Sequence, residues 1–466
     1  AGSRLVLHSA RSTGRFRFPL FPVMQSWRYF PNPFGAPTSG STAAALPPGP
    51  ANAEAAWAQA TGFLLEFDEC ASRSCVPCPR RARDGRIVLD WKGKYEVYTG
   101  LAGVAVAYLR AGLFWRRACR NEAAAQEYLQ KTQDVAAACL QLDPRSNEVS
   151  FMCGTPGYLA ILCVTCFLLG ESEASAAHLK QLLSWSNAAV RHSEDELLFG
   201  RAGYLYALLW VRHHCGADKA DFDTPLQQVV ERLVETGRRR AAQGYSGWHW
   251  PLMWHCFDEP YVGAAHGLVG VLAMLLHCFG LLCPESQQLV SATIERLLHE
   301  RFESGNLPIV LGGQDDEHVH WCHGAPGLPG LALAARAAQA AGAAVPHALT
   351  SALVEAAVKA GDVVWQRGLI LKGNGLCHGI AGNAYTFLSL RRLTADASQL
   401  SRAQAFAAML SHGPLQEAIA KQPDSQRKVP GMPDSPRSLL EGSAGVFCYL
   451  LDLADPDSAA FPGWEL

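Results

Sequence analysis

The stretch Gly100-Leu-Ala-Gly-Val-Ala-Val-Ala-Tyr-Leu109 contains the pattern that decides the fold, two glycines three positions apart at the start of an apolar run. The pattern Gly-x-x-Gly occurs seven times, and each copy opens such a run. The copies are Gly100–Gly103, Gly154–Gly157, Gly200–Gly203, Gly267–Gly270, Gly324–Gly327, Gly379–Gly382 and Gly442–Gly445. Successive first glycines are 46 to 67 residues apart, which fits one two-helix unit with its connections. Seven repeats of one unit therefore predict a single repeat architecture.

Two kinds of helix alternate in the predicted repeat. Runs such as Leu101–Leu109 and Tyr204–Val211 are apolar on all sides, which is typical of buried helices. The segments between them are amphipathic: in Leu289–Glu300, four aliphatic side chains share a face opposite Glu295 and Arg296. An all-apolar helix belongs inside and an amphipathic helix outside. The sequence predicts an all-α protein, a seven-fold α/α toroid with seven inner and seven outer helices.

The repeated glycines have two possible roles. They either allow a close backbone approach where a loop enters an inner helix, or expose N–H groups that bind phosphate. Because no ligand needs seven phosphate sites, we expect the structural role.

Composition excludes several classes of function. The chain is 49% hydrophobic and 18% charged, with a net charge of −2, so no overall nucleic-acid or membrane signature appears. The longest apolar stretches, Gly157–Gly170 and Val271–Cys283, are shorter than the ~18 to 20 residues of a transmembrane helix. The 15 cysteines are scattered without a disulfide framework, which indicates reduced thiols and a cytoplasmic location.

The first 53 residues differ from the rest. They contain five arginines and no acid, since the first carboxylate is Glu54. Residues 1–23 resemble an organelle transit peptide, or else they precede a start at Met24. Pro31–Pro50 is rich in proline and glycine and predicts an extended linker. We expect residues 54–466 to form one α/α barrel domain.

A Cys-x-x-Cys pair, Cys75 and Cys78, follows Cys70 in a short segment. Such a pair can bind zinc or exchange disulfides, but no fourth ligand is nearby and three arginines follow. We expect a solvated loop.

Candidate functional residues precede the glycines of three consecutive repeats. The pairs are Ala265-His266, Cys322-His323 and Cys377-His378, whereas the other four repeats carry mostly unreactive pairs. Equivalent positions of a ring converge at one end, and thiolate and imidazole are preferred ligands of Zn²⁺. A zinc site is therefore favoured over buried core cysteines. If all four Cys and His side chains of the last two pairs bind the ion, the site is closed. If only three of them bind it, one coordination position stays open, and the spacing of the residues does not decide between these two possibilities.

Longer stretches around these pairs resemble a known family. They are Gly263-Ala-Ala-His-Gly-Leu-Val-Gly270, Trp321-Cys-His-Gly-Ala-Pro-Gly327, Trp365-Gln-Arg-Gly-Leu-Ile-Leu-Lys-Gly-Asn-Gly-Leu-Cys-His-Gly-Ile-Ala-Gly-Asn383, Arg28-Tyr-Phe-Pro-Asn-Pro33 and Phe461-Pro-Gly-Trp-Glu-Leu466. Together they resemble the eukaryotic LanC-like proteins, relatives of bacterial lantibiotic cyclases. The resemblance runs from about Met24 to the C-terminus and leaves out residues 1–23 and the Cys70–Cys78 loop.

The resemblance implies a seven-fold barrel with one zinc ion at its mouth. The implied ligands are Cys322, Cys377 and His378, with the fourth position open and His323 left as a neighbouring or proton-handling residue. Family members of this kind bind glutathione as co-substrate. They add its thiol to dehydroalanine or dehydrobutyrine in proteins or peptides, including residues formed by loss of phosphate from phosphoserine or phosphothreonine. We therefore expect a transferase that forms a thioether.

The remaining residues fit that chemistry. Two thiolates would balance the charge of Zn²⁺, which would deprotonate an incoming thiol. Addition to the alkene leaves an enolate that needs a proton, and His266 is placed to donate it, with His323 as the rival acid. The simpler alternative for His266 is a hydrogen-bonded histidine that fills the pore. Lys372 and Arg28 match family positions that serve glutathione or phosphate binding, and the alternative for either one is a solvated surface charge. For Arg28 to take this role, the N-terminal arm around residues 28–34 must fold back over the mouth of the barrel.

One departure from the family pattern weakens the phosphate-elimination part. Related proteins tend to have an arginine shortly before the dipeptide Pro433-Asp434, where this chain has Gly431-Met432. Arg437 or Arg427 would have to compensate.

Other functions fit the sequence less well. A non-catalytic adaptor that binds glutathione and zinc is the main alternative. A lantibiotic cyclase is disfavoured because one chain offers no dehydratase module, and a glycosidase is disfavoured because the positions before the repeat glycines offer Glu441 alone as a carboxylate.

Overall fold

The computed structural model describes residues 28–34, 49–50, 53–68, 80–81, 87–88, 93–143, 147–216, 219–244, 249–422 and 435–466. The predictions made for the leader at 1–23, the start at Met24, most of the proline-rich stretch, the cysteines at 70–78, and Arg427 with residues 431–434 lie outside these ranges.

The described helices form two sets. The first set comprises α2 (Leu101–Arg117), α4 (Thr155–Leu169), α7 (Arg201–Cys215), α9 (Leu268–His277), α11 (Leu328–Ala340), α13 (Ile380–Thr394) and α16 (Ser443–Ala454). The second comprises α1 (Ala53–Asp68), α3 (Glu122–Leu142), α5 (Ser172–Ser184), α8 (Lys219–Gln243), α10 (Pro284–His299), α12 (His347–Arg367) and α14 (Ala397–Met409). Shorter elements are α6 (Ser186–Arg191), α15 (Gly413–Ala420), the 3₁₀ turns η2 (Phe279–Leu281) and η3 (Ala325–Gly327), and the antiparallel pair β1 (Arg80–Arg81) and β2 (Ile87–Val88).

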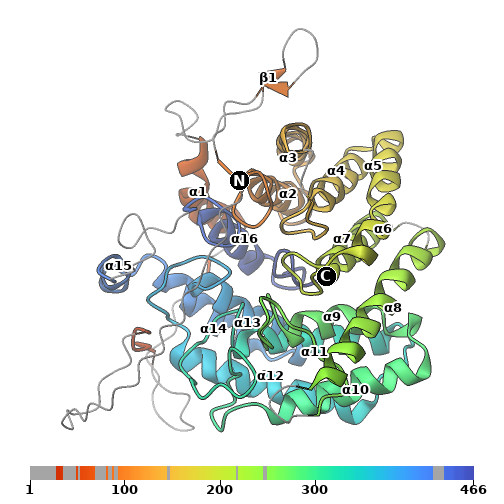
Figure 1. The fold of residues 1–466 in the computed structure, drawn as a ribbon. Coiled ribbons are helices and arrows are strands. Elements are labelled where there is room, and N and C mark those ends of the chain that lie inside the picture. Colours follow the sequence, from red (N-terminus) through yellow and green to blue (C-terminus); the bar gives the residue numbers. More distant parts are fainter. Residues whose placement is uncertain are drawn as a thin grey trace.

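The first set closes into a ring around the molecule's centre (Figure 1). Each helix of this set contacts the next one along the chain, and α16 returns to contact α2. Each also contacts one helix of the second set, and α1 covers α16, so the start of the chain completes the outer ring. Over the residues that the structure describes, seven inner and seven outer helices thus form the predicted double ring, and the all-α toroid is confirmed.

Burial follows the sequence pattern of each ring. In α9, every residue from Leu268 to Leu276 is buried, whereas in α10 one face is buried, including Val290, Ile294 and Leu297. Burial of each aliphatic side chain contributes about 1.5 to 3 kcal/mol, and this burial against the inner ring fixes α10 on the outside.

The repeated glycines allow the entry loop to touch the helix that it precedes. A Cβ atom on the second glycine of six copies would lie 1.7 to 2.3 Å from the carbonyl oxygen six residues earlier. The first helical N–H groups already donate to that loop: Leu268 N to Tyr261 O at 3.1 Å, and Ile380 N to Gly373 O at 3.0 Å. These amides are therefore occupied, which supports the structural role of the glycines over phosphate binding.

The repeat of Gly324 is the exception. Its φ is +108°, a conformation that side chains rarely adopt, and η3 precedes α11 in this repeat. A Cβ on its second glycine, Gly327, would meet the side chain of Ala264 at 3.0 Å instead of a carbonyl.

The C-terminal residues 459–466 fill the centre of the ring. Phe461 stacks on Trp321 with ring centroids 4.7 Å apart, directly beside Cys322 in sequence. The buried Glu465 accepts a hydrogen bond from Arg392 of α13 at 3.0 Å, and its backbone oxygen accepts one from Tyr206 of α7 at 3.4 Å. The chain end therefore ties opposite inner helices together beneath the mouth.

No helix among the described residues combines the length and the apolar character that a membrane crossing requires.

The glycine contacts generate a first prediction. Gly382→Ala places a Cβ 1.7 Å from the carbonyl oxygen of Leu376, the residue before Cys377, so backbone must move. We expect a loss of at least about 2 kcal/mol in the free energy of unfolding, measured by chemical denaturation. Gly413→Ala is the control, because nothing lies within 4 Å of the methyl group that it adds, and its stability should change by less than about 0.5 kcal/mol. Equal effects of the two substitutions would contradict the structural role.

Candidate metal centre and its surroundings

The loops that enter the inner helices are joined to one another by backbone hydrogen bonds. Cys322 N donates to Cys377 O at 3.2 Å, Cys377 N to Leu440 O at 2.7 Å, Leu440 N to Tyr98 O at 3.1 Å, and Tyr98 N to Met152 O at 3.0 Å. All five residues stand two positions before the first glycine of their repeat. The repeat thus brings equivalent residues side by side, and it makes Cys322 and Cys377 direct neighbours.

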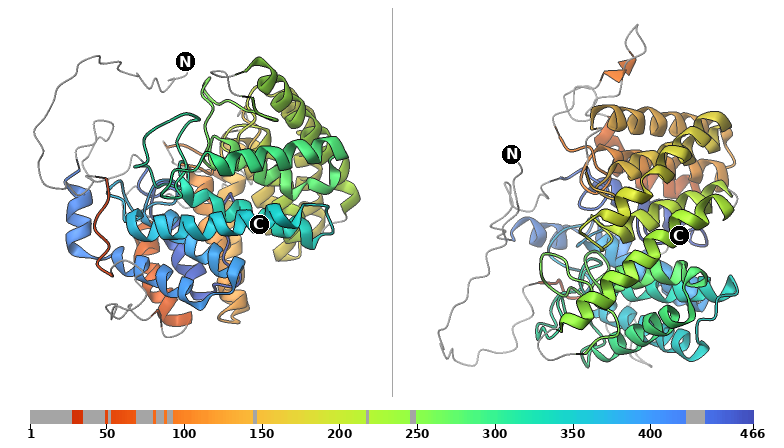
Figure 2. Two further views of the ribbon diagram at one scale, coloured as in Figure 1. Left: turned by 90° about the horizontal axis from the view of Figure 1, so that it is seen from below. Right: turned by 45° about the vertical axis from the view of Figure 1, so that its right-hand side comes forward.

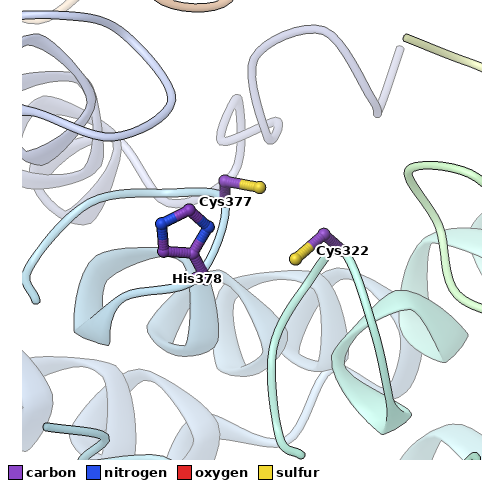
Figure 3. Close-up of side chains that lie close together, drawn as sticks. All are labelled: Cys322, Cys377 and His378. Carbon is purple, nitrogen blue, oxygen red and sulfur yellow. The ribbon is translucent and has the colours of Figure 1, made fainter. Parts of the chain in front are cut away.

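Cys322, Cys377 and His378 form a cluster at this junction. Their sulfur and imidazole nitrogen atoms all lie within 4.8 Å of one another, and both cysteines are buried. Cys377 and His378 come from the loop into α13 and Cys322 from the neighbouring repeat (Figure 3). Two sulfurs and one imidazole suit a Zn²⁺ site with an open fourth position. His323 does not belong to this group.

Burial raises the pKa of the Cys377 thiol well above its usual value, and the adjacent Cys322 raises it further. Two buried thiols side by side are costly to ionise unless a cation lies between them. A divalent metal supplies that charge and deprotonates coordinating thiols. The residues present therefore fit a zinc ion.

Tyr98 contacts this cluster, a feature that the sequence analysis did not recognise. Its hydroxyl donates a hydrogen bond to Cys377 Sγ at 3.1 Å. Burial, and then the nearby Cys377 and Cys322, raise the pKa of Tyr98, so the phenol keeps its proton and remains a donor. The sequence did contain a signal for this contact, because Tyr98 occupies the same position in its repeat as Cys322 and Cys377 do in theirs.

His266 is held by a buried carboxylate. Its Nδ1 lies 3.2 Å from Glu196 Oε2 and 3.8 Å from Cys256 Sγ. Glu196 is fixed in turn by the backbone N–H groups of Leu198 and Phe199, at 2.7 and 2.6 Å. Burial alone lowers the pKa of His266, but the hydrogen bond and charge of Glu196 outweigh it and the pKa is raised. The sequence analysis considered the two positions before each repeat glycine, and Glu196 was not predicted because it stands four positions before Gly200.

His323 has the opposite electrostatic environment. Its ring centroid lies 6.1 Å from that of His266 and 5.4 Å from that of Tyr261. Burial, assisted by the charge of His266, lowers the pKa of His323 to about 3. Of the two candidate acids, His266 is therefore the one whose surroundings favour the protonated form.

Residues 28–34 fold back onto the barrel, beside the helices that follow α13 (Figure 2, left, red segment). Tyr29 pairs with Ile370 in an isolated antiparallel bridge, with Phe30 N donating to Leu369 O at 2.7 Å and Leu371 N donating to Arg28 O at 2.9 Å. Arg28 is thereby placed next to the strand-like segment that ends at Lys372. The arm therefore lies against the barrel along residues 369–371, and the role predicted for Arg28 stays a prediction.

The Arg28 side chain contacts a loop that the sequence analysis did not single out. Its Nε lies 2.6 Å from Glu317 Oε2 and its Nη2 3.6 Å from Asp315 Oδ2, and it also contacts His318. Burial lowers the pKa of His318, and the charges of Arg28 and Lys372 add to this effect. The charges of Arg28 and Lys372 therefore both act on His318.

Arg437 lies in the loop that leads into α16, three residues before Leu440. That loop accepts the backbone hydrogen bond from Cys377 described above.

Comparison with known proteins relates the whole barrel to one family. Residues 92–466 match the family model described as lanthionine synthetase C-like protein. The chain is 34% identical over 375 residues to a Danio rerio protein named glutathione S-transferase LANCL1, covering 79% of this chain and 84% of the relative. It is 31% identical over 406 residues to the LanC-like protein GCL1 of Arabidopsis thaliana, covering 81% and 85%. Among solved structures, nisin cyclase shares the fold, with a TM-score of 0.56 at 15% identity over 85% of this chain and 93% of that chain.

The contact between His266 and Glu196 generates a second prediction. Glu196→Gln removes the charge that raises the pKa of His266 and leaves burial, which lowers it. We expect the His266 pKa to fall below 6.5, measured by NMR titration of the imidazole signals. Cys256→Ala, which removes the thiol 3.8 Å away but keeps the carboxylate, should leave the pKa raised. An unchanged pKa in Glu196→Gln would show that another group holds the proton.

Proposed function

This chain belongs to the lanthionine synthetase C-like family, and we propose that it is a zinc-dependent enzyme that joins the thiol of glutathione to dehydroalanine or dehydrobutyrine residues of proteins or peptides. The single observation that carries the proposal is the buried Cys322, Cys377 and His378 cluster, next to a histidine whose pKa is raised. The printed name of the zebrafish relative, glutathione S-transferase LANCL1, supports glutathione as the co-substrate.

In this proposal, Cys322, Cys377 and His378 hold one Zn²⁺. When bound, the ion lowers the pKa of a thiol that enters its open position, so that a thiolate forms near neutral pH. The hydroxyl of Tyr98 donates to Cys377 Sγ and so draws electron density from this sulfur. The neighbouring side chains of the protein orient the reactants and handle the proton.

His266 is the proposed proton donor. Attack of the glutathione sulfur on the β-carbon of a dehydroalanine forms the C–S bond and moves the alkene electrons into an enolate. A proton at the α-carbon completes the addition. Glu196 raises the pKa of His266 and contacts its Nδ1, which leaves Nε2 for the substrate. Burial lowers the pKa of His323 to about 3, which makes it the weaker candidate for the acid.

Lys372 and Arg28 are proposed to bind the carboxylates of glutathione, or a phosphate of the substrate. After burial, the charge of Lys372 contributes to the lowered pKa values of His318, His320 and His323. Arg28 is held nearby by the backbone pairing of residues 28–30 with residues 369–371. Both cations would then face an anionic co-substrate at one edge of the metal cluster.

Metal content gives a third prediction. We expect about one Zn²⁺ per chain, measured by mass spectrometry of the metal in purified protein. Cys322→Ala and Cys377→Ala should lose most of it, because each removes one of three ligands. His323→Ala, the control outside both groups of potential ligands, should retain it. Loss of zinc from His323→Ala would instead indicate a closed site with four protein ligands.

Transfer of glutathione gives a fourth prediction. A peptide that contains dehydroalanine should gain one glutathione in the presence of the protein, detected by mass spectrometry. His266→Ala should slow this reaction about 10² to 10⁴-fold with unchanged zinc content, and His323→Ala should slow it less. With His266 as the acid, the wild-type rate should fall as pH rises through the raised pKa.

Two outcomes separate this reaction from the alternative, a non-catalytic protein that binds glutathione and zinc. Binding of glutathione by calorimetry without any adduct would favour the binder. An adduct that forms at the same rate with His266→Ala would remove this histidine from the chemistry.

A further inference from the structure

A basic pocket of about 480 Å³ lies beside the site, between α6, the C-terminal half of α8 and the turn at Phe257. Its lining includes five arginines, Arg191, Arg201, Arg232, Arg239 and Arg240. Three carboxylates also line it, those of Glu194, Asp195 and Asp258, so its formal charge is positive. Nothing in the chemistry proposed above uses these arginines.

Part of this charge is already paired within the protein. Arg201 is buried and contacts Asp195, which also accepts a hydrogen bond from Thr236 at 3.0 Å. Arg232 contacts Glu235 at 2.7 Å. The Nε–H groups of Arg201 and Arg232 are nevertheless buried without a hydrogen-bond partner among the described residues. Arg201 and Arg232 are therefore held by contacts within the protein, and the charge available to a ligand comes from the other arginines.

The other three arginines, Arg191, Arg239 and Arg240, are exposed at the end of α6 and the last turns of α8. Within the part of the chain that the structure describes, no carboxylate lies within 4.0 Å of their guanidinium groups. Arg240 contacts the neutral Gln243, at 3.5 Å. Three arginines that converge on one pocket without an acidic partner are suited to bind an anion from outside.

Phe257 connects this pocket with His266. Phe257 lines the pocket, its side chain is 66% exposed, and its ring centroid lies 5.9 Å from that of His266. It stands with Asp258 at the tip of a tight turn, in which Cys256 and Glu259 exchange backbone hydrogen bonds at 3.0 Å. Both tip residues have positive φ, +52° and +62°. Such a conformation is costly for residues other than glycine, and strain of this kind concentrates at functional sites.

We propose that this pocket binds an anionic side chain of the peptide substrate, a carboxylate or a phosphate, while the residue to be modified reaches His266 across Phe257. The inference rests on the proposed function for the identity of the reacting residue. The planar guanidinium groups match either anion in a bidentate manner. Because an extended chain advances about 3.3 to 3.6 Å per residue, the anionic residue lies about two to five positions from the reacting one.

The test is direct binding, which needs no reaction. A fluorescent peptide with serine at the reacting position is titrated by anisotropy in three versions: with aspartate, with phosphoserine or with glutamine at positions two to five residues away. We expect the two anionic versions to bind at least tenfold more tightly than the glutamine version. Arg191→Gln/Arg239→Gln/Arg240→Gln should remove this difference, and higher salt should reduce it.

A control variant and a kinetic assay complete the test. Lys180→Gln/Lys421→Gln removes exposed charges outside the pocket and should keep the preference. In the kinetic assay with dehydroalanine peptides and glutathione, the triple arginine variant should have an about tenfold higher KM for anionic peptides and an unchanged kcat. Its KM and kcat for the neutral peptide should equal those of the wild type.

Each result has a defined meaning. Arginine-dependent binding without adduct formation would support the pocket and reject the enzyme. Equal affinity of the wild type for anionic and neutral peptides would overturn the pocket proposal. So would arginine-dependent sedimentation with vesicles containing anionic lipid, if the anionic peptides do not bind.

Discussion

The structure depends on one close contact, between the second glycine of each repeat and the carbonyl oxygen six residues before it. In six of seven copies no side chain fits there. The contact folds each entry loop tightly against the first turn of its inner helix, and the loop carbonyls accept the N–H groups that a helix start leaves free. Because the same loop recurs around the ring, the residues before each glycine meet at one end. A metal cluster needs this repetition, since Cys322 and Cys377 lie on loops from different repeats.

The C-terminal residues in the centre of the ring pack against the loops that carry the cluster. Phe461 stacks on Trp321, and Trp321 precedes Cys322. Glu465 and Tyr206 join the chain end to helices on different sides of the ring. The C-terminal residues therefore pack beside Cys322, a proposed metal ligand that is far away in sequence.

The histidines near the cluster have different pKa values because their surroundings differ in charge. His320 is buried and His318 and His323 are half-buried, and this desolvation, with the positive charge of Lys372 as one further cause, lowers their pKa values. His266 is also half-buried, but Glu196 outweighs the desolvation and raises its pKa. One buried carboxylate thus gives a single histidine of this group a raised pKa, which is why His266 is the one proposed as the proton donor. The same loop, residues 191–196, continues into the arginine pocket, so the proposed anchor for the substrate and the support of the proton donor share one segment of backbone.

The sequence alone determined the class of fold and the place of the cluster. The features that predict the fold are local in the sequence. A close backbone contact requires a glycine pair, a buried helix requires an all-apolar run, and a half-exposed helix requires an amphipathic segment. The cysteines at equivalent positions were visible for the same reason. Only the tertiary structure decided which distant groups touch: Glu196 with His266, Tyr98 with Cys377, the Arg28 arm with residues 369–371, and Phe257 with the arginine pocket. These contacts join residues that are 70 to 343 positions apart or lie on different elements. No periodic pattern in the sequence records a pairing that ring closure alone creates.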